Sequence, residues 1–186
     1  MMSHTALSLP LPDFTHERVE TRTGHRSGLV ITVALHSSAL GPALGGARLW
    51  TYPHWSDALG DALRLSSAMT LKNAAAGLDA GGGKSVIALE PGTVLDAERR
   101  RAAFLDLGDA VEALGGLYRT AEDVGSTTDD MLIVSERTDH VVGLPEAGGG
   151  SGEPAGPTSL GVYESIRATL ERVTGSADVA GRRITV

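Results

Sequence analysis

Residues 69–89 read MTLKNAAAGLDAGGGKSVIAL, and this stretch decides how the chain is expected to fold. It ends a helical pattern, turns through a run of glycines and enters a buried strand at 85–89. It also contains Lys72 and Lys84, the only two lysines among 16 cationic side chains. Because a buried ammonium can lose its proton near neutral pH and a guanidinium cannot, lysine at these positions indicates a chemical task. A chance pair of surface lysines is the alternative.

On either side of this stretch, predicted strands alternate with predicted helices. Ser56 is the expected N-cap of the helix that leads to Lys72. The other helices are predicted at 96–114, 127–137 and 158–173, and the strands at 18–22, 28–36, 85–89, 117–120 and 140–144. This alternation predicts an α/β fold with a sheet covered on its faces. Ligands bind at strand ends in such sheets, where we expect the loops 41–46, 77–84 and 121–126.

Composition excludes several classes of function. The formal net charge of -7 leaves no basic stripe for nucleic acid. The chain has no cysteine, and its six histidines show no ligand spacing, so we predict no metal site. No apolar run approaches membrane-spanning length, and no targeting signal stands at the N-terminus. We therefore expect a cytoplasmic protein without nucleic-acid or membrane partners.

The glycine-lysine sequence at 81–85 invites comparison with a phosphate-binding loop. Five residues separate Gly77 from Gly83, whereas that loop needs four before Gly-Lys-Ser. Its lysine must also open a helix, and here Lys84 leads into a predicted strand. We therefore reject nucleotide hydrolysis. We instead expect the glycines to bring the backbone close to a ligand or to adopt positive φ, and to place Lys84 at the start of the strand.

The two lysines suggest how a site could work. A lysine buried near a second lysine has its pKa lowered by desolvation and by like charge, which makes it a usable general base. The other lysine can stay charged and hold a carboxylate. Asp123 is the best-placed acid to exchange protons with an amine, although a turn carboxylate is the simpler interpretation of it alone. Lys72, Lys84 and Asp123 are thus expected to converge on one water-poor cavity that suits an apolar amino acid.

Four segments carry a family resemblance: GPALGGARLW at 41–50, MTLKNA at 69–74, GGGKSVI at 81–87 and TAEDVG at 120–125. In order and spacing they resemble the leucine, phenylalanine and valine dehydrogenases of the glutamate dehydrogenase superfamily, from about residue 20 to 186. The resemblance implies a sheet of mixed strands covered by helices on both faces. It also implies a substrate-binding and oligomerisation domain over 1–144. Residues 145–186 would be the hinge, the crossover helix and the first strand of an NAD-binding domain.

The resemblance also implies roles for single residues. Lys84 resembles the general base that activates water, Asp123 the residue that moves protons on and off the amine, and Lys72 the holder of the substrate carboxylate. The resemblance implies further that the substrate is contacted by Gly45, Gly46 and Met69. It places Thr158 near the nicotinamide.

We therefore expect NAD-dependent oxidative deamination of an apolar L-amino acid (Leu, Val, Ile or Phe) to its 2-oxo acid and ammonia, in a homo-oligomer that is at least a dimer. The glycine-rich turn that should follow 181–186 is absent from the sequence, so most of the NAD site is expected outside these residues. On its own the chain is expected to be inactive. The alternative is a catalytically inactive, truncated or standalone domain that dimerises or binds amino acids.

Overall fold

The computed structural model describes residues 12–185, which form two compact units. The first unit ends at Ser151 and contains the sheet with its covering helices. The second begins at Gly152 and contains one long helix. The sequence predicts a functional boundary at residue 144, and this boundary stays a prediction.

A mixed five-stranded sheet forms the centre of the first unit, in the order β1-β2-β4-β3-β5. β2 pairs antiparallel with both β1 and β4, whereas β3 runs parallel to β4 and β5. The strands are β1 Arg18–Thr23, β2 Val30–Ser37, β3 Ala43–Thr51, β4 Gly81–Leu89 and β5 Tyr118–Glu122. The predicted mixed α/β sheet is confirmed.

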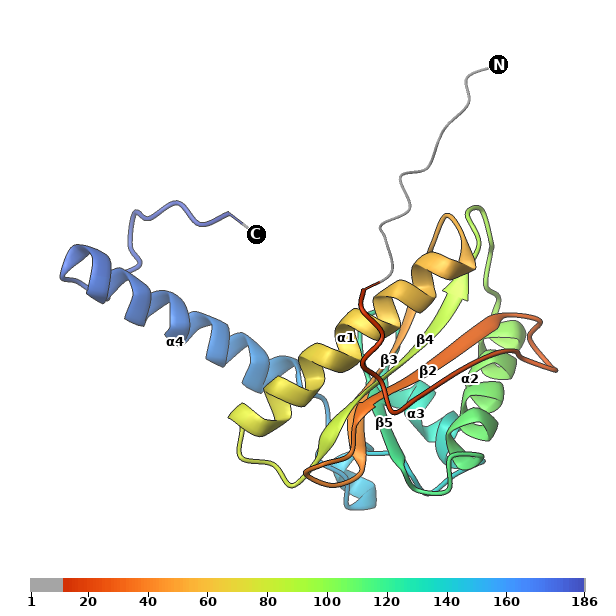
Figure 1. Cartoon of the computed structure of the whole chain (residues 1–186). Coiled ribbons are helices and arrows are strands. Elements are labelled where there is room, and N and C mark those ends of the chain that lie inside the picture. Colours follow the sequence, from red (N-terminus) through yellow and green to blue (C-terminus); the bar gives the residue numbers. More distant parts are fainter. Residues whose placement is uncertain (1–11, 186) are drawn as a thin grey trace. The chain divides into compact units, whose positions relative to one another are not determined.

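Helices cover both faces of this sheet (Figure 1). α1 (Trp55–Ala75) lies on one face, and α2 (Ala97–Glu112) and α3 (Thr128–Ser135) lie on the other. Successive strand residues point to opposite faces. Ile31 and Val33 of β2 therefore pack in the core with α2 and α3, whereas Ala34 packs against α1. β2 and β4 are buried on both faces, as expected of central strands.

The sequence wrongly predicts loops where β3 and β4 begin. β3 starts at Ala43 and β4 at Gly81, so both strands run through their glycine segments. A β-carbon on Gly45 would lie 1.7 Å from the carbonyl oxygen of Gly83. The glycines therefore allow neighbouring backbones to approach closely within the sheet, which is a known use of glycine in strands.

Some element ends also differ from prediction. His54, not Ser56, caps α1: its side chain accepts from the backbone nitrogen of Ser56, and the Asp57 side chain accepts from the backbone nitrogen of His54. The strand predicted at 140–144 is reduced to one bridge between Val141 and Thr120. No strand forms over 182–185, and residue 186 lies outside the described residues.

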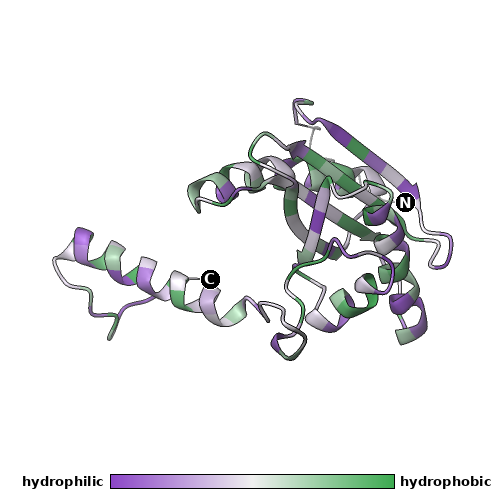
Figure 2. Ribbon diagram, turned by 90° about the horizontal axis from the view of Figure 1, so that it is seen from below, coloured by the Kyte–Doolittle hydropathy of each residue, from purple (hydrophilic) through white to green (hydrophobic). Residues whose placement is uncertain are grey.

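The second unit consists mainly of α4 (Ala155–Thr174), and a short 3₁₀ helix, η1 (Glu146–Gly148), lies before it at the end of the first unit. Gly175 directly follows α4, and its positive φ of 77° suits glycine at a helix C-terminus. Hydrophobic and hydrophilic residues alternate in groups along α4 (Figure 2). Over residues 12–185, no helix combines the length and apolar character needed to cross a membrane.

Candidate active site

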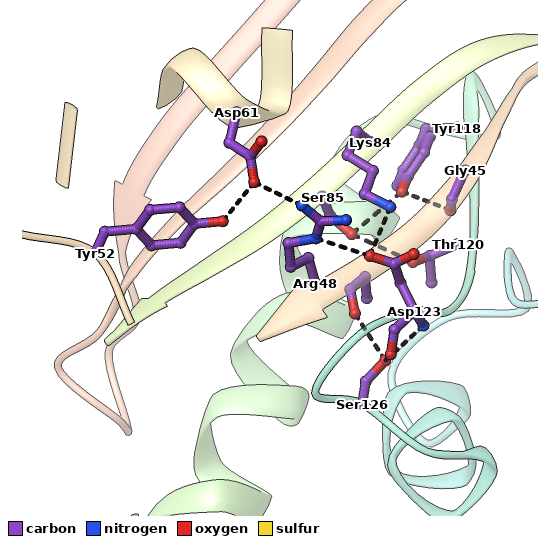
Figure 3. Close-up of polar contacts among 11 residues, drawn as sticks. Gly45, Arg48, Tyr52, Asp61, Lys84, Ser85, Tyr118, Thr120, Asp123 and Ser126 are labelled. Carbon is purple, nitrogen blue, oxygen red and sulfur yellow. Dashed lines mark hydrogen bonds and ion pairs between the residues drawn. The ribbon is translucent and has the colours of Figure 1, made fainter. Parts of the chain in front are cut away.

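Three neighbouring strands bring the candidate residues together (Figure 3). Lys84 lies on β4, Arg48 on β3, and Asp123 directly follows β5. Alternation along β4 places Lys84 on the same face as Val86 and Ala88, which pack against α1. The site therefore lies between the sheet and α1, at the C-terminal end of β5.

Lys84 is buried and paired with Asp123. Its side chain is 4% exposed, and Nζ lies 2.8 Å from Oδ2 of Asp123. Burial lowers the pKa of Lys84, the negative charge of Asp123 opposes that shift, and Arg48 lowers it further. The sequence attributes the like charge to Lys72, but in the structure Arg48 supplies it.

Asp123 is held by the loop that follows β5. Its backbone nitrogen donates to Oγ of Ser126 at 2.8 Å, and that hydroxyl donates to the carbonyl oxygen of Ala47 on β3 at 2.7 Å. Burial alone would raise the pKa of the Asp123 carboxyl, but Lys84 and Arg48 outweigh it and hold the pKa below its usual value. Asp123 is therefore an ionised group with partial access to solvent.

Beside this pair lie further charged and hydroxyl groups that the sequence does not predict. Nε of Arg48 donates to Oδ2 of Asp123 at 3.0 Å, and Nη1 donates to Oδ2 of Asp61 at 2.9 Å. The hydroxyl of Tyr52 donates to the same oxygen of Asp61 at 2.7 Å. Strand alternation could have revealed Arg48, because it follows Gly46 by two residues and so shares its face of β3.

Gly45 and Gly46 shape the backbone around this pair. A β-carbon on Gly46 would lie 2.7 Å from the Asp123 β-carbon, so glycine lets Asp123 approach β3. The carbonyl oxygen of Gly45 accepts a 2.8 Å hydrogen bond from the hydroxyl of Tyr118. Burial raises the pKa of Tyr118 to about 12, so this hydroxyl remains a donor.

Lys72 has a different environment. It lies in the last turn of α1 and is exposed, so the structure does not bring it into the buried cluster around Lys84. Met69 is half-buried one turn earlier. Asn73, next to Lys72, donates from Nδ2 to the carbonyl oxygen of Gly81 at 2.6 Å and ties this helix end to β4. Thr158 is exposed on α4, in the second unit.

The described residues contain no group of three or more His, Cys, Asp or Glu side chains that could hold a metal ion. Lys84, Asp123 and Arg48 supply the site with an amine, a carboxylate and a guanidinium. Together they can bind a charged small molecule and transfer protons.

A buried lysine and an aspartate thus lie in contact at the strand ends of a mixed α/β sheet, where ligands bind in many α/β folds. The sequence profile described as "Glu/Leu/Phe/Val dehydrogenase, dimerisation domain" matches residues 14–140. This chain belongs to that family.

Curated relatives cover most of this chain. A leucine dehydrogenase of Bacillus cereus is 43% identical over 95% of the chain and 47% of its own length. A phenylalanine dehydrogenase of Bacillus thermotolerans is 40% identical over 96% of the chain and 48% of its own length. A valine dehydrogenase of Streptomyces virginiae is 40% identical over 92% of the chain and 47% of its own length. The chain thus spans about half the length of these relatives.

Solved structures show the same fold. An L-tryptophan dehydrogenase from Nostoc punctiforme matches with a TM-score of 0.64 and 35% identity, over 88% of this chain and 44% of that one. A glutamate dehydrogenase from Thermus thermophilus matches with a TM-score of 0.66 over 86% of this chain and 41% of that one. At 22% identity, the second similarity concerns the fold alone.

Proposed function

We propose that this chain is the amino-acid-binding part of an NAD-dependent dehydrogenase that converts an apolar L-amino acid to its 2-oxo acid and ammonia. The observation that carries the proposal is the buried Lys84, whose Nζ lies 2.8 Å from Oδ2 of Asp123. Membership of the Glu/Leu/Phe/Val dehydrogenase family supports an amino acid as the substrate. The named relatives include enzymes for leucine, phenylalanine and valine, which support an apolar side chain.

Lys84 is assigned the role of general base. Burial lowers its pKa, so its neutral amine is accessible at a lower pH than that of a solvated lysine. The neutral amine takes a proton from water as the water oxygen bonds to the imino carbon of the oxidised substrate. That oxygen becomes the oxo group of the product, and the substrate nitrogen leaves as ammonia.

Asp123 is assigned proton exchange with the substrate amine. Its low pKa keeps it ionised near neutral pH, so it can accept a proton from the substrate ammonium before oxidation. It can return a proton to the nitrogen when ammonia leaves. Its contact with Lys84 also provides a path for protons between the base and the amine.

The substrate carboxylate is assigned to Lys72, whose exposed ammonium stands at the end of α1. The backbone at Gly45 and Gly46 is proposed to line the same pocket, and Met69 to contact the substrate side chain. The tie between Asn73 and Gly81 supports this arrangement, because it holds the end of α1 against β4.

NAD is proposed as the cofactor of the whole protein. Most of its site is proposed to lie outside residues 12–185, because the chain spans about half the length of its curated relatives. Thr158 on α4 is proposed to lie near the nicotinamide, and we assign no step of the reaction to the cofactor. The family description as a dimerisation domain supports a homo-oligomer, at least a dimer.

The decisive experiment is a substrate screen with the complete polypeptide encoded by the gene. We expect NADH production from leucine, valine, isoleucine or phenylalanine. Lys84→Ala should lower kcat by roughly 10²–10⁴-fold, the usual contribution of a general base. Lys72→Ala should mainly raise KM for the amino acid, because it removes binding rather than proton transfer.

Arg101→Ala is the control, since this exposed residue pairs with Glu136 on the surface and should leave turnover unchanged. Unchanged turnover in Lys84→Ala would contradict the base assignment. Absence of turnover with every apolar amino acid, combined with amino-acid binding by the chain, would favour an inactive binding or dimerisation domain.

A further inference from the structure

Arg48 connects two carboxylates that come from different elements. Nε lies 3.0 Å from Oδ2 of Asp123, after β5, and Nη1 lies 2.9 Å from Oδ2 of Asp61, on α1. A single guanidinium therefore bridges the helix and the loop on either side of the site (Figure 3). The side chain of Arg48 is only 23% exposed. A partly desolvated, planar guanidinium of this kind fixes the direction of the groups that it binds.

We propose that Arg48 is a positioning residue: anchored by Asp61, it holds Oδ2 of Asp123 beside Lys84 and leaves Oδ1 to meet the substrate amine. This inference rests on the proposed function. Oδ2 of Asp123 accepts from Arg48 and pairs with Lys84, whereas Oδ1 has no hydrogen-bond donor among residues 12–185. When one oxygen of a carboxylate is held in place, the other oxygen points in a defined direction.

Asp61 is itself held in place, so it can serve as an anchor. Its Oδ2 accepts from the hydroxyl of Tyr52 at 2.7 Å, and its Oδ1 lies 3.7 Å from the guanidinium of Arg64. Burial, together with the negative charge of Asp61, raises the pKa of Tyr52, so the hydroxyl stays protonated and continues to donate. Arg48 therefore binds a carboxylate whose own position is fixed from two sides.

Arg48 and Asp61 also act on Lys84 with opposite sign. After burial, which lowers the pKa of Lys84, the charges that face it are Asp123 and Asp61, which raise that pKa, and Arg48, which lowers it. The buried hydroxyl of Tyr118, on β5, is neutral because its pKa is about 12. Loss of the Arg48 charge should therefore raise the pKa of Lys84, and loss of the Asp61 charge should lower it.

The first test is a titration that does not depend on enzymatic activity. Because the chain has two lysines, isotope-labelled lysine gives one NMR signal from Lys84 and one from Lys72, and Lys84→Arg assigns them. Arg48→Met should move the Lys84 midpoint up and Asp61→Asn should move it down, each by about half a pH unit or more. The Lys72 signal is the internal reference. Movement in the same direction in both variants, or no movement, would overturn the electrostatic part of the proposal.

The second test separates charge from geometry in the complete enzyme. Arg48→Lys keeps the charge but cannot bridge both carboxylates, so kcat should fall roughly 10- to 100-fold while KM for the amino acid changes less than about threefold. In Arg48→Lys, the rise of kcat on the acidic side of the pH profile should occur at the same pH as in the wild type. In Arg48→Met this rise should move to higher pH, because turnover needs neutral Lys84. A fully active Arg48→Lys enzyme would overturn the positioning role.

These outcomes are distinguishable from failure of the proposed function. If the enzyme turns over normally without Lys84, the proposed function fails whatever Arg48 does. If Lys84 is essential but Arg48→Lys is fully active, only the positioning role of Arg48 fails. Urea-unfolding midpoints close to wild type establish that each variant is folded.

Discussion

Two aspartates of the first unit are held in opposite ways. The side chain of Asp106 is 3% exposed and accepts hydrogen bonds from Arg26 and Ser27 at both of its oxygens. The side chain of Asp123 is 24% exposed, and both of its cationic partners, Lys84 and Arg48, contact Oδ2. Asp106 therefore fixes the β1–β2 turn to α2, whereas Asp123 keeps hydrogen-bonding capacity for a ligand.

Asp130 extends the comparison. Its side chain is only 4% exposed, Oδ1 and Oδ2 both bind the guanidinium of Arg100, and Oδ2 also accepts from Thr127. Like Asp106, it is both buried and bonded at both oxygens, whereas Asp123 is neither. A carboxylate whose two oxygens are both held by donors has little capacity left for a substrate.

The largest change in stability is expected from Asp106→Ala. This substitution leaves the buried backbone nitrogen of Ser27 without its acceptor at 2.9 Å. The free energy of unfolding should fall by about 3 kcal/mol, since hydrogen bonds to a buried charge are lost and donors remain unpaired. Urea denaturation of the chain measures this loss. A loss below about 1 kcal/mol would remove the distinction drawn between Asp106 and Asp123.

A smaller, pH-dependent change is expected from Asp123→Asn. Because the folded pKa of Asp123 is depressed, its ionisation contributes stability above the unfolded pKa of about 3.9, and this is lost as pH falls through the folded pKa. The variant should be less stable by about 1 kcal/mol at pH 7, with the difference shrinking toward pH 3. Unfolding curves across this range test it, and the exposed Asp79→Asn is the control. A difference that stays constant with pH would contradict the expectation.

The smallest change is expected from Lys84→Met. The substitution removes an ammonium that is expensive to bury, and Arg48 remains to neutralise Asp123. Replacing a buried ion-pair partner by an apolar group of similar length should then change the free energy of unfolding at pH 7 by less than about 1 kcal/mol. Thermal and urea unfolding measure this change. A loss as large as that of Asp106→Ala would show that Lys84 is mainly structural.

Much of the fold could be predicted because apolar patterning follows the burial of strands and helices. The uniformly apolar 29–35 stretch predicts a central strand, and β2 is buried on both faces. The sequence predicts loops at 41–46 and 77–84, which are rich in glycine, and glycine weakens strands on average. In the structure, close approach between β3 and β4 overrides that preference. Such contacts between distant segments leave no periodic signal in the sequence.

The sequence predicts some residues of the candidate site and not others. The sequence predicts that Lys72, Lys84 and Asp123 converge, and the structure places the side chains of Lys84 and Asp123 in contact. The sequence shows Arg48 only as part of a motif and does not single out Asp61, because charged residues on a helix or strand usually face solvent. Lys72 was expected in a water-poor cavity, but within the described residues it is exposed. The partner of a charge is a property of three-dimensional packing, which local patterns do not specify.

The unequal accessibility of the two lysines has a practical consequence for anyone who attaches this chain to a surface or a dye. Amine-reactive reagents need a neutral nitrogen that they can reach, and Lys84 is almost wholly enclosed. Apart from the terminal amine, coupling will therefore be directed to Lys72. A sensor or immobilised catalyst prepared in this way would be tethered through the residue that is proposed to bind the substrate carboxylate. Thiol chemistry at an introduced cysteine is therefore the better route.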